Sequence, residues 1–357
     1  MKLLRLVLDV SETSGAYYLF SVPFSKICDQ TILSLFEPEL IPLDSLNIIN
    51  TKKSIIDYIK KLYKEIKYNR YDVVHAHTPH VGILAYFVCL FILNKRKTPK
   101  LFSIHYSFNH IKLRNKLMLI PIFITFDSIV FCSKASFNSF PSLYKKLVEN
   151  KYKLIYNGVN TEIKPTIHRD KKNEKFFNII TVSRLEKFKN IQKVIEALSK
   201  INDDSIKLKI VGDGAAKEYL ENKAKKYNHN KNIQFLGQVP RKEVIFNLSN
   251  SDLFISLSNS EGFPVSVLEA LINKCAVVLS NIEPHLDLAK NNQIIDIVEI
   301  NDEKKLVDRI LYHKKMNSKK RSLLGKKCNQ FVDENYSQSV MINNYFTEYK
   351  KLLKTNY

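Results

Sequence analysis

Short apolar runs with the character of β-strands alternate with helix-like segments from one end of this chain to the other. Such alternation predicts βαβ units with parallel sheets and argues against a β-sandwich or a helical bundle. A polar, charged stretch at residues 168–175 has no periodicity and is expected to be a linker, after which the pattern restarts. We therefore predict an α/β chain of two doubly wound parallel-sheet domains. Their expected boundaries are 1–167 and 168–336, with a terminal helix at 337–357.

Apolar periodicity locates the expected elements within each half. Strands are expected at residues 3–9, 31–36, 72–75, 100–105, 128–132 and 152–156, and again at 176–182, 206–211, 232–235, 252–257 and 276–279. Helical spacing predicts two amphipathic helices, with apolar positions Ile55, Ile59, Leu62 and Ile66 in one and Met341, Tyr345, Tyr349 and Leu352 in the other.

Cysteine usage and hydropathy indicate a cytoplasmic protein. The chain has five cysteines, an odd number without C-x-x-C spacing, which predicts neither a disulfide framework nor a zinc site. The amino-terminal run carries charges among its apolar residues and is expected to be a strand, not a signal peptide. The longest apolar stretch, residues 81–93, is too short to span a bilayer as a helix.

The formal net charge of +21 requires an anionic partner or a solvated basic surface. Basic residues bracket the apolar segments 81–93 and 117–126, an arrangement expected of a surface that lies on anionic lipid headgroups. The alternative is that lysine is merely abundant in this chain. We expect no nucleic-acid partner, because no recognisable module or aromatic-interleaved basic stretch occurs. The bracketing residues are Lys95, Arg96, Lys97, Lys100, Lys112, Arg114 and Lys116.

The segment 258–274 contains two carboxylates, Glu261 and Glu269, eight residues apart across a predicted strand-to-helix junction. Gly262 permits a sharp turn, and Pro264 suits the first helical position. Ligands of open α/β sheets bind at the carboxyl ends of strands, where the helix amino end offers free N–H groups to a phosphate. Two carboxylates beside it can accept hydrogen bonds from hydroxyl groups. A phosphate flanked by two polyols describes a nucleotide sugar.

Two cations follow the predicted strand 176–182. Arg184 lies two residues after its end, and Lys189 precedes an apolar helical repeat. A leaving nucleoside diphosphate gains negative charge as its glycosidic bond breaks, and a guanidinium and an ammonium can stabilise that charge without a metal. No D-x-D triplet, the usual carboxylate pair for a metal-bound diphosphate, occurs in the chain. We therefore expect no metal and no cofactor.

These segments resemble motifs of the retaining GT-B glycosyltransferases, in particular family 4 (glycosyl transferases group 1). Glu261 and Glu269 match the E-x7-E motif, and Arg184 to Lys189 match R-L-x-x-x-K. The resemblance implies two Rossmann-like domains facing a cleft, with the terminal helix crossing back to the first domain. It also implies that Glu261 binds the transferred sugar and Glu269 the ribose. Backbone amides between the two glutamates would hold the diphosphate, and Gly262, Phe263 and Pro264 of that turn are expected donor-binding residues.

Other motifs extend the resemblance to both halves. Gly214, in Gly-Asp-Gly, resembles a turn beside the nucleotide base, and Gly15 stands where the family usually has a Gly-Gly pair near the diphosphate. His105, at the end of a predicted strand, resembles a histidine that contacts the donor sugar; the alternative is a structural strand-end histidine. His77 is expected to line the acceptor cleft. It forms an H-x-H pair with His75, but no further ligands indicate a metal site.

The combined prediction is a retaining, metal-independent glycosyltransferase. It would move sugar from a UDP- or GDP-sugar to a saccharide or lipid-linked saccharide in bacterial surface polysaccharide synthesis, such as O-antigen, capsule or lipopolysaccharide. Glu261, His105, Arg184 and Lys189 are the expected catalytic residues. We expect a cytoplasmic protein, peripheral at the inner face of the plasma membrane. The alternatives are a sugar-nucleotide epimerase or phosphorylase of the same fold, and a non-enzymatic basic protein that binds membrane or nucleic acid.

Overall fold

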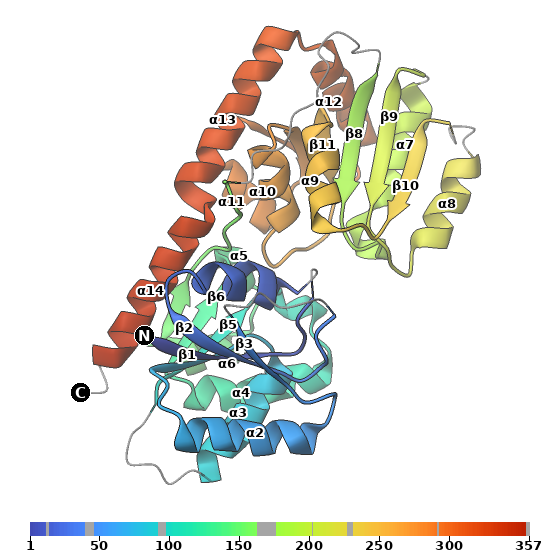
Figure 1. Ribbon diagram of the computed structural model, residues 1–357. Helices are drawn as coiled ribbons and strands as arrows, with labels where there is room; N and C mark the ends of the chain where they lie inside the picture. The colour runs from blue at the N-terminus through green and yellow to red at the C-terminus, as the bar shows by residue number, and fades with distance from the viewer. Residues whose placement is uncertain are drawn as a thin grey trace. The chain divides into compact units, whose positions relative to one another are not determined.

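The computed structural model describes residues 1–11, 14–39, 46–91, 98–162, 176–201, 203–226, 231–290 and 293–354. The chain divides into two compact units: Met1–Gly158 with Gln338–Tyr357 form unit 1, and Val159–Ser337 form unit 2. Each unit contains one parallel sheet with helices packed against it (Figure 1). The predicted pair of doubly wound α/β domains is thus confirmed. The expected linker at 168–175 lies outside the described residues.

Seven parallel strands form the sheet of unit 1 in the order β3-β2-β1-β4-β5-β6-β7. The chain runs from β1 outward through β2 and β3 and then returns to pair β4 with the other side of β1. This reversal creates a topological switch point at the carboxyl ends of β1 and β4, where such sheets bind ligands. The strands are β1 (Lys2–Val7), β2 (Asp29–Ser34), β3 (Asn47–Asn50), β4 (Val73–Ala76), β5 (Lys100–Ile104), β6 (Ser128–Phe131) and β7 (Tyr152–Leu154).

Helices cover both faces of this sheet. The long helices α2, α3 and α4 pack on one face through a shared apolar core. On the opposite face, rings of η1 and α1 meet rings of α14, for example Phe20 with Tyr345 and Phe24 with Tyr349. The helical segments are η1 (Ala16–Ser21), α1 (Val22–Phe24), α2 (Ile55–Tyr68), α3 (Pro79–Phe91), η2 (Phe108–His110), α4 (Leu113–Thr125), α5 (Lys134–Asn138), α6 (Ser142–Val148) and α14 (Gln338–Lys354).

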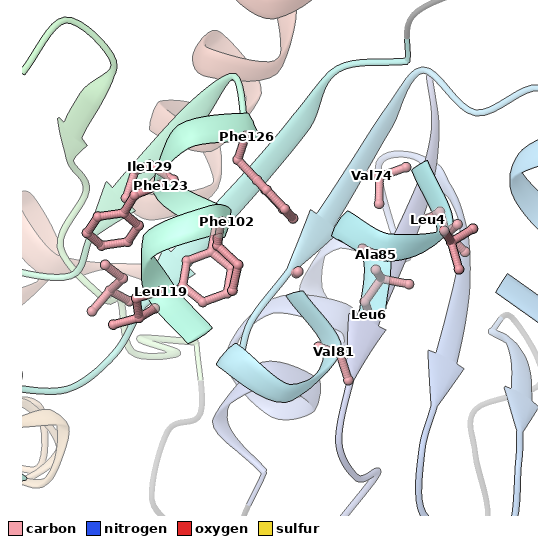
Figure 2. Close-up of a cluster of buried hydrophobic side chains, with 14 of the residues drawn as sticks. Leu4, Leu6, Val74, Val81, Ala85, Phe102, Leu119, Phe123, Phe126 and Ile129 are labelled. Carbon is pink, nitrogen blue, oxygen red and sulfur yellow. The ribbon is translucent and has the colours of Figure 1, made fainter. Parts of the chain in front are cut away.

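The core of unit 1 fills the space between the strands and helices α3 and α4 (Figure 2). Leu6 of β1 and Phe102 of β5 have no exposed surface, and the same holds for Val81 of α3 and Leu119 of α4. Burying one such side chain contributes roughly 1.5–3 kcal/mol. This packing holds the strand ends in place, and with them the side chains that follow β1, β4 and β5.

Unit 2 has six parallel strands in the order β10-β9-β8-β11-β12-β13, so its switch point lies between β8 and β11. Its strands are β8 (Phe177–Val182), β9 (Ile206–Val211), β10 (Ile233–Gly237), β11 (Leu253–Ser256), β12 (Ala276–Ser280) and β13 (Ile295–Val298). Its helical segments are η3 (Lys187–Lys189), α7 (Ile191–Ile201), α8 (Lys217–Lys226), α9 (Arg241–Ser249), α10 (Val265–Ile272), α11 (Glu283–Ala289), α12 (Glu303–Lys315) and α13 (Ser318–Tyr336).

The terminal helix was predicted with the correct buried face. Its four apolar positions, from Met341 to Leu352, are all buried in α14. Glu348 lies on the same face and accepts a hydrogen bond from Ser128 Oγ at 2.8 Å, which satisfies its carboxylate. The segment Gln338–Tyr357 belongs to unit 1 although it follows unit 2 in sequence.

Helix α2 forms where predicted, but only part of its expected apolar face is buried: Leu62 lies in the core and Ile66 packs against it, as predicted. Ile55 and Ile59 are 55% and 36% exposed, whereas Tyr58 and Leu62 are fully buried. Tyr58 lies one residue away from the aliphatic stripe, and burying its larger ring turns the helix so that the isoleucines face outward. Two edge strands, β3 and β13, were not predicted. Each is only four residues long and contains polar residues, so neither has a clear apolar run.

Candidate active site

The switch point of unit 2 gathers three of the predicted site residues. Arg184 and Lys189 follow β8, and Glu261 follows β11, its neighbour in the sheet. Because parallel strands place their carboxyl ends at one edge of the sheet, the two loops meet there. These three predicted residues, which come from separate motifs, therefore lie at one edge of the unit 2 sheet.

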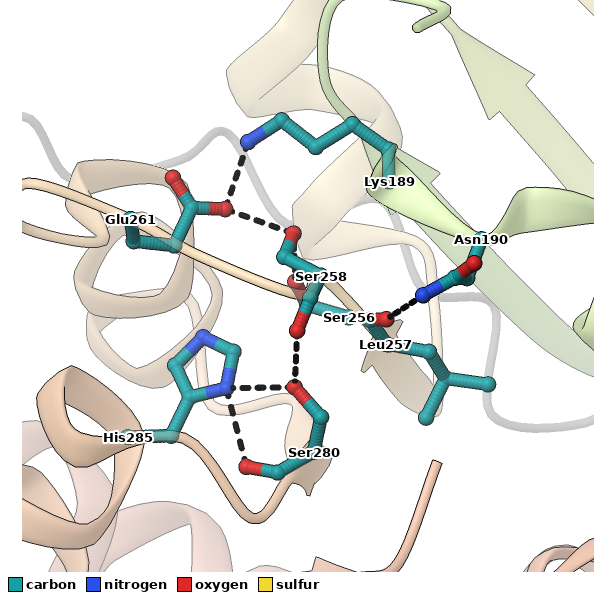
Figure 3. A network of polar contacts seen from close by, with 8 residues as sticks. All are labelled: Lys189, Asn190, Ser256, Leu257, Ser258, Glu261, Ser280 and His285. Carbon is teal, nitrogen blue, oxygen red and sulfur yellow. Dashed lines mark hydrogen bonds and ion pairs between the residues drawn. The ribbon is translucent and has the colours of Figure 1, made fainter. Parts of the chain in front are cut away.

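Lys189, Glu261 and Ser258 form a compact polar cluster in this crevice (Figure 3). The Glu261 carboxylate oxygen Oε1 accepts a hydrogen bond from Lys189 Nζ at 2.5 Å and another from Ser258 Oγ at 2.6 Å. The side chains of Lys189 and Glu261 are 12% and 17% exposed. They are therefore well enclosed yet still reachable by a ligand, and one oxygen of the carboxylate anchors its orientation.

Asn190 fixes the position of Lys189. Its backbone is left-handed, with φ at 54°, a conformation that asparagine tolerates better than most residues. Its side-chain amide donates to Leu257 O at 2.8 Å and to Asn259 Oδ1 at 2.7 Å, and Asn259 N donates to Phe188 O. These bonds tie the loop after β8 to the loop after β11, so the ammonium and the carboxylate keep their relative placement.

The Gly-Asp-Gly turn after β9 packs directly on the loop that carries Arg184. A Cβ atom on Gly212 would lie 1.9 Å from Ser183 O, and one on Gly214 would lie 2.6 Å from Leu185 O. Both glycines also have positive φ, at 126° and 156°, which side-chain-bearing residues rarely adopt. Gly214 thus allows a close backbone approach that shapes the crevice. Arg184 itself is exposed at its edge.

Glu269 lies on α10, as expected; it is also buried, and its partner was not predicted. Its carboxylate forms an ion pair with Arg241, the first residue of α9. A cation at a helix start opposes the helix dipole, and this unfavourable placement is a sequence signal that could have identified Arg241. Among the loop residues, Gly262 is partly exposed, and Phe263 is buried against the Tyr336 ring. Pro264 caps α10, one position earlier than expected.

His285 also lies beside the cluster and was not predicted. Its Nδ1 lies 3.1 Å from Ser280 O, a carbonyl that can only accept, so the proton resides on Nδ1. The other ring nitrogen, Nε2, has no hydrogen-bond partner among the described residues and is turned toward the side where Glu261 lies (Figure 3). Burial lowers the pKa of His285 to about 4; the Glu261 carboxylate raises this pKa and the Lys189 ammonium lowers it, each by less than burial does. The buried ring is therefore neutral and holds an acceptor nitrogen beside the cluster.

In unit 1, the histidines that follow β4 and β5 form a buried cluster. His77 Nδ1 lies 3.2 Å from His105 Nε2, and the two rings are stacked. His77 was expected to line the acceptor cleft, but it is only 1% exposed and is therefore buried. His105 is partly exposed. Gly15 caps the amino end of η1 in an ordinary right-handed conformation, and a Cβ there would make only an ordinary contact, 3.9 Å from Leu19 Cδ1.

No group of three or more His, Cys, Asp or Glu side chains able to hold a metal ion is found in the portion of the chain that is described. Metal-free transfer therefore stays a prediction. Nor does any helix of these portions have the length and apolarity needed to cross a membrane.

We predict that acidification destabilises the fold at pH values well above those at which carboxylates usually titrate. Burial lowers the pKa of His75 and His77 well below the ordinary value, and it lowers the pKa of His105 and His285 to about 4. Between pH 6.5 and the folded-state values, the unfolded chain binds protons that the folded chain does not. Stability is thus greatest above pH 6.5 and falls with decreasing pH, by up to about 1.4 kcal/mol per pH unit for each histidine.

Urea unfolding at pH 7.5, 6.5 and 5.5 checks this expectation. The variant His285→Gln replaces one of the four imidazoles with an amide. Because an amide does not titrate, the unfolding free energy of this variant should depend less on pH. An unfolding free energy that stays constant from pH 7.5 to 5.5 would show that these imidazoles are not held neutral by the fold.

The comparisons with known proteins cover both units. Residues 36–163 match the family model "Glycosyltransferase Family 4", and residues 163–331 match "Glycosyl transferases group 1". An Escherichia coli O-antigen biosynthesis glycosyltransferase, WclY, is 27% identical over 328 residues, 87% of each chain. An E. coli UDP-Gal:alpha-D-GlcNAc-diphosphoundecaprenol alpha-1,3-galactosyltransferase is 28% identical over 79% of this chain and 75% of its own. The crystal structure of Anabaena HepE in complex with UDP has a TM-score of 0.79 at 16% identity, covering 98% of this chain and 100% of HepE.

The two parallel-sheet units agree with the fold of HepE. The E-x7-E and R-L-x-x-x-K motifs of unit 2 agree with the matches to both family models. The chain belongs to the glycosyl transferases group 1 of family 4 and is a glycosyltransferase of the GT-B fold.

Proposed function

We propose that this enzyme transfers a sugar from a UDP- or GDP-sugar to a saccharide or lipid-linked saccharide, with retention of configuration, during bacterial surface polysaccharide synthesis. The observation that carries the proposal is the Lys189–Glu261 pair at the switch point of unit 2. It places a cation and an anchored carboxylate in one crevice beside the amino end of α10. The cation is complementary to a diphosphate, and the carboxylate is complementary to a sugar hydroxyl.

In this proposal, each charged side chain around the crevice binds one part of the donor. Lys189 and the exposed Arg184 face the diphosphate and stabilise the charge that grows as the glycosidic bond breaks. Glu261 keeps one carboxylate oxygen on Ser258 and uses its remaining acceptor capacity for sugar hydroxyls. Glu269 accepts hydrogen bonds from the ribose, with Arg241 compensating its charge.

The relatives support the donor and acceptor classes. The E. coli galactosyltransferase is named for a UDP-sugar donor and a diphosphoundecaprenol-linked acceptor, WclY for O-antigen biosynthesis, and HepE was crystallised with UDP. In our proposal, the acceptor hydroxyl attacks from the face that the leaving group vacates, and the leaving phosphate oxygen takes its proton. Neither a carboxylate nucleophile nor a metal takes part, and transfer in the presence of excess EDTA tests the latter.

A panel of nucleotide sugars tests the proposed function. A donor that binds the folded protein at 100 times its Kd should stabilise it by about 2.7 kcal/mol, which is measurable as a thermal shift. The stabilising nucleotide sugar is then incubated with lipid-linked saccharides to detect transfer. A protein that no UDP- or GDP-sugar stabilises would contradict the proposal. Turnover without an acceptor would favour an epimerase, and dependence on free phosphate would favour a phosphorylase.

We also propose that the outer surface of α2, α3 and α4 docks on an anionic membrane. Exposed apolar side chains project from this surface: Ile56, Phe87, Leu90, Leu113 and Leu117 are each at least 49% exposed. Exposed basic residues accompany them on the same helices: Lys60, Lys64, Lys67, Lys112 and Arg114. Apolar insertion combined with basic residues is the pattern of peripheral proteins on anionic lipid.

The docking surface differs in part from the one expected from sequence. Lys100 does not contribute to it, because its side chain is buried and pairs with Asp127 at 3.6 Å. Its position at the start of a central strand explains the burial. The predicted cluster at 95–97 lies outside the described residues. Helix α2 supplies Ile56 and exposed lysines to this surface, whereas the sequence pattern had placed it only around the segments 81–93 and 117–126.

Vesicle sedimentation checks this surface. The double variant Lys60→Gln/Lys64→Gln should bind anionic vesicles roughly 30-fold more weakly, because each lysine near such a surface contributes about 1 kcal/mol. The matched control Lys326→Gln/Lys327→Gln removes an exposed lysine pair from α13 and should bind as wild type does. Equal loss in both variants would show that net charge alone matters, and no binding by wild type would reject the docking surface.

A further inference from the structure

Arg5 is a buried cation whose hydrogen-bond acceptors are all neutral. It lies in the middle of β1 with no exposed surface. Its Nε donates to Gln30 Oε1 at 2.8 Å, and its Nη1 lies 3.1 Å from His75 Nδ1 and 3.2 Å from His77 Nε2. The Phe24 ring covers the guanidinium at 4.5 Å. A buried charge without a carboxylate is costly, so its retention here calls for a reason.

The neighbouring phenols do not provide a negative charge. Tyr345 and Tyr349 of α14 face the same cluster, and Tyr349 OH lies 2.7 Å from His75 Nδ1. Burial raises the pKa of Tyr345, and it raises the pKa of Tyr349 to about 12, so both phenols stay neutral. The dipoles of imidazole, amide and phenol groups therefore stabilise the guanidinium.

The guanidinium determines which nitrogen of each imidazole carries the proton. Arginine only donates hydrogen bonds, so His77 Nε2 must accept, and the proton of His77 lies on Nδ1. That Nδ1–H points to His105 Nε2 at 3.2 Å, which must accept in turn. The proton of neutral His105 is therefore on Nδ1, opposite to the tautomer that an isolated neutral histidine favours.

We propose that Arg5 and His77 are positioning residues that hold His105 as the neutral Nδ1–H tautomer. His105 directly follows β5 and is the partly exposed end of the relay, whereas Arg5 and His77 are buried. With Nε2 engaged by His77, the donor group left on the ring is Nδ1–H, and the Asn157 side chain also interacts with His105. A donor at this place suits a sugar hydroxyl or phosphate oxygen; this consequence rests on the proposed function.

The tautomer can be measured on the unliganded full-length protein, independently of any activity. Histidine-selective 15N labelling and two-bond 1H–15N correlation spectra report which ring nitrogen is protonated, and His105→Gln identifies the His105 signals. We expect the Nδ1–H pattern for His105 in the wild type at pH 7.5. The Nε2–H pattern, or a charged ring, would overturn the relay.

Two substitutions of His77 test the relay itself. The amide of His77→Gln can accept from Arg5 and donate to His105, so the tautomer should persist; His77→Leu can do neither and should shift His105 toward Nε2–H. His80→Gln, on the partly exposed histidine that contacts Arg114, is the matched control. An unchanged tautomer in His77→Leu would overturn the proposal, and if that variant does not fold, the wild-type and His77→Gln spectra still decide it.

Kinetics separate positioning from mere structural support. The variant His77→Leu should lower kcat roughly ten-fold or more with donor affinity nearly unchanged, whereas His77→Gln retains most of kcat. Equal kcat in wild type and His77→Leu would overturn the positioning role. If the wild type transfers no sugar at all, the proposed function fails, but the spectra still decide the relay.

Discussion

Replacing Lys189 with methionine is expected to lower kcat/KM for sugar transfer roughly 100- to 1,000-fold while the protein stays folded. The ammonium is the cation held most firmly in the crevice of unit 2, bonded to Glu261 at 2.5 Å and positioned by the turn that Asn190 ties down. Methionine keeps the length of the side chain but removes the charge that stabilises the departing diphosphate. Steady-state kinetics with a radiolabelled donor measure the loss, and circular dichroism checks the fold.

The matched control for this prediction is Lys187→Met. Lys187 lies in the same turn, η3, but is exposed. The Lys187→Met variant should retain a kcat/KM close to the wild-type value. Glu261→Gln should also transfer sugar much more slowly, because the carboxylate that binds the sugar becomes a neutral amide, and the relative rates of the residual transfer with different sugars should change. Wild-type kinetics in both Lys189→Met and Glu261→Gln would refute the assignment of the crevice.

The features of the fold and of the site that could be predicted from sequence are those determined by local patterns. Lys189 and Glu261 each follow an apolar strand, and parallel strands place their carboxyl ends at one edge of the sheet, so the sequence placed both residues at that edge; their direct contact depends on the pairing of β8 with β11. The buried face of α14 was likewise evident from its spacing. In each case one segment of sequence contains the whole signal.

Partners that come from a distant segment were not predictable in this way. Arg241 reaches Glu269 only because α9 packs beside α10, and His285 lies near Glu261 because β12 is the neighbour of β11. Arg5 was visible as a charge in an apolar strand, but its histidine partners depend on the pairing of β1 with β4. The orientation of α2 depends on how the core accommodates Tyr58, and sequence periodicity does not contain that volume constraint.

Replacing Glu269 with alanine is expected to have the second large effect, because it leaves Arg241 charged and enclosed without its carboxylate. Breaking a fully buried ion pair costs about 3–5 kcal/mol. The Glu269 side chain is 9% exposed and Arg241 is 23% exposed, so partial solvation reduces the expected loss to roughly 2–3 kcal/mol. Urea denaturation measures it. Glu303→Ala, which breaks an exposed pair with Lys200, should cost no more than about 1 kcal/mol.

A double variant separates stability from nucleotide binding. Replacing Glu269 and Arg241 together with methionine removes both charges and should restore most of the stability, since apolar residues often substitute for a buried pair without loss. Binding of UDP and GDP should still weaken, each by roughly ten- to a hundred-fold, because a charged hydrogen bond to the ribose contributes about 1.5–3 kcal/mol whichever base is attached. Calorimetry with both nucleotides measures this. Unweakened binding in a stable double variant would mean that Glu269 only supports α9 and α10, and that the ribose is bound elsewhere in the crevice.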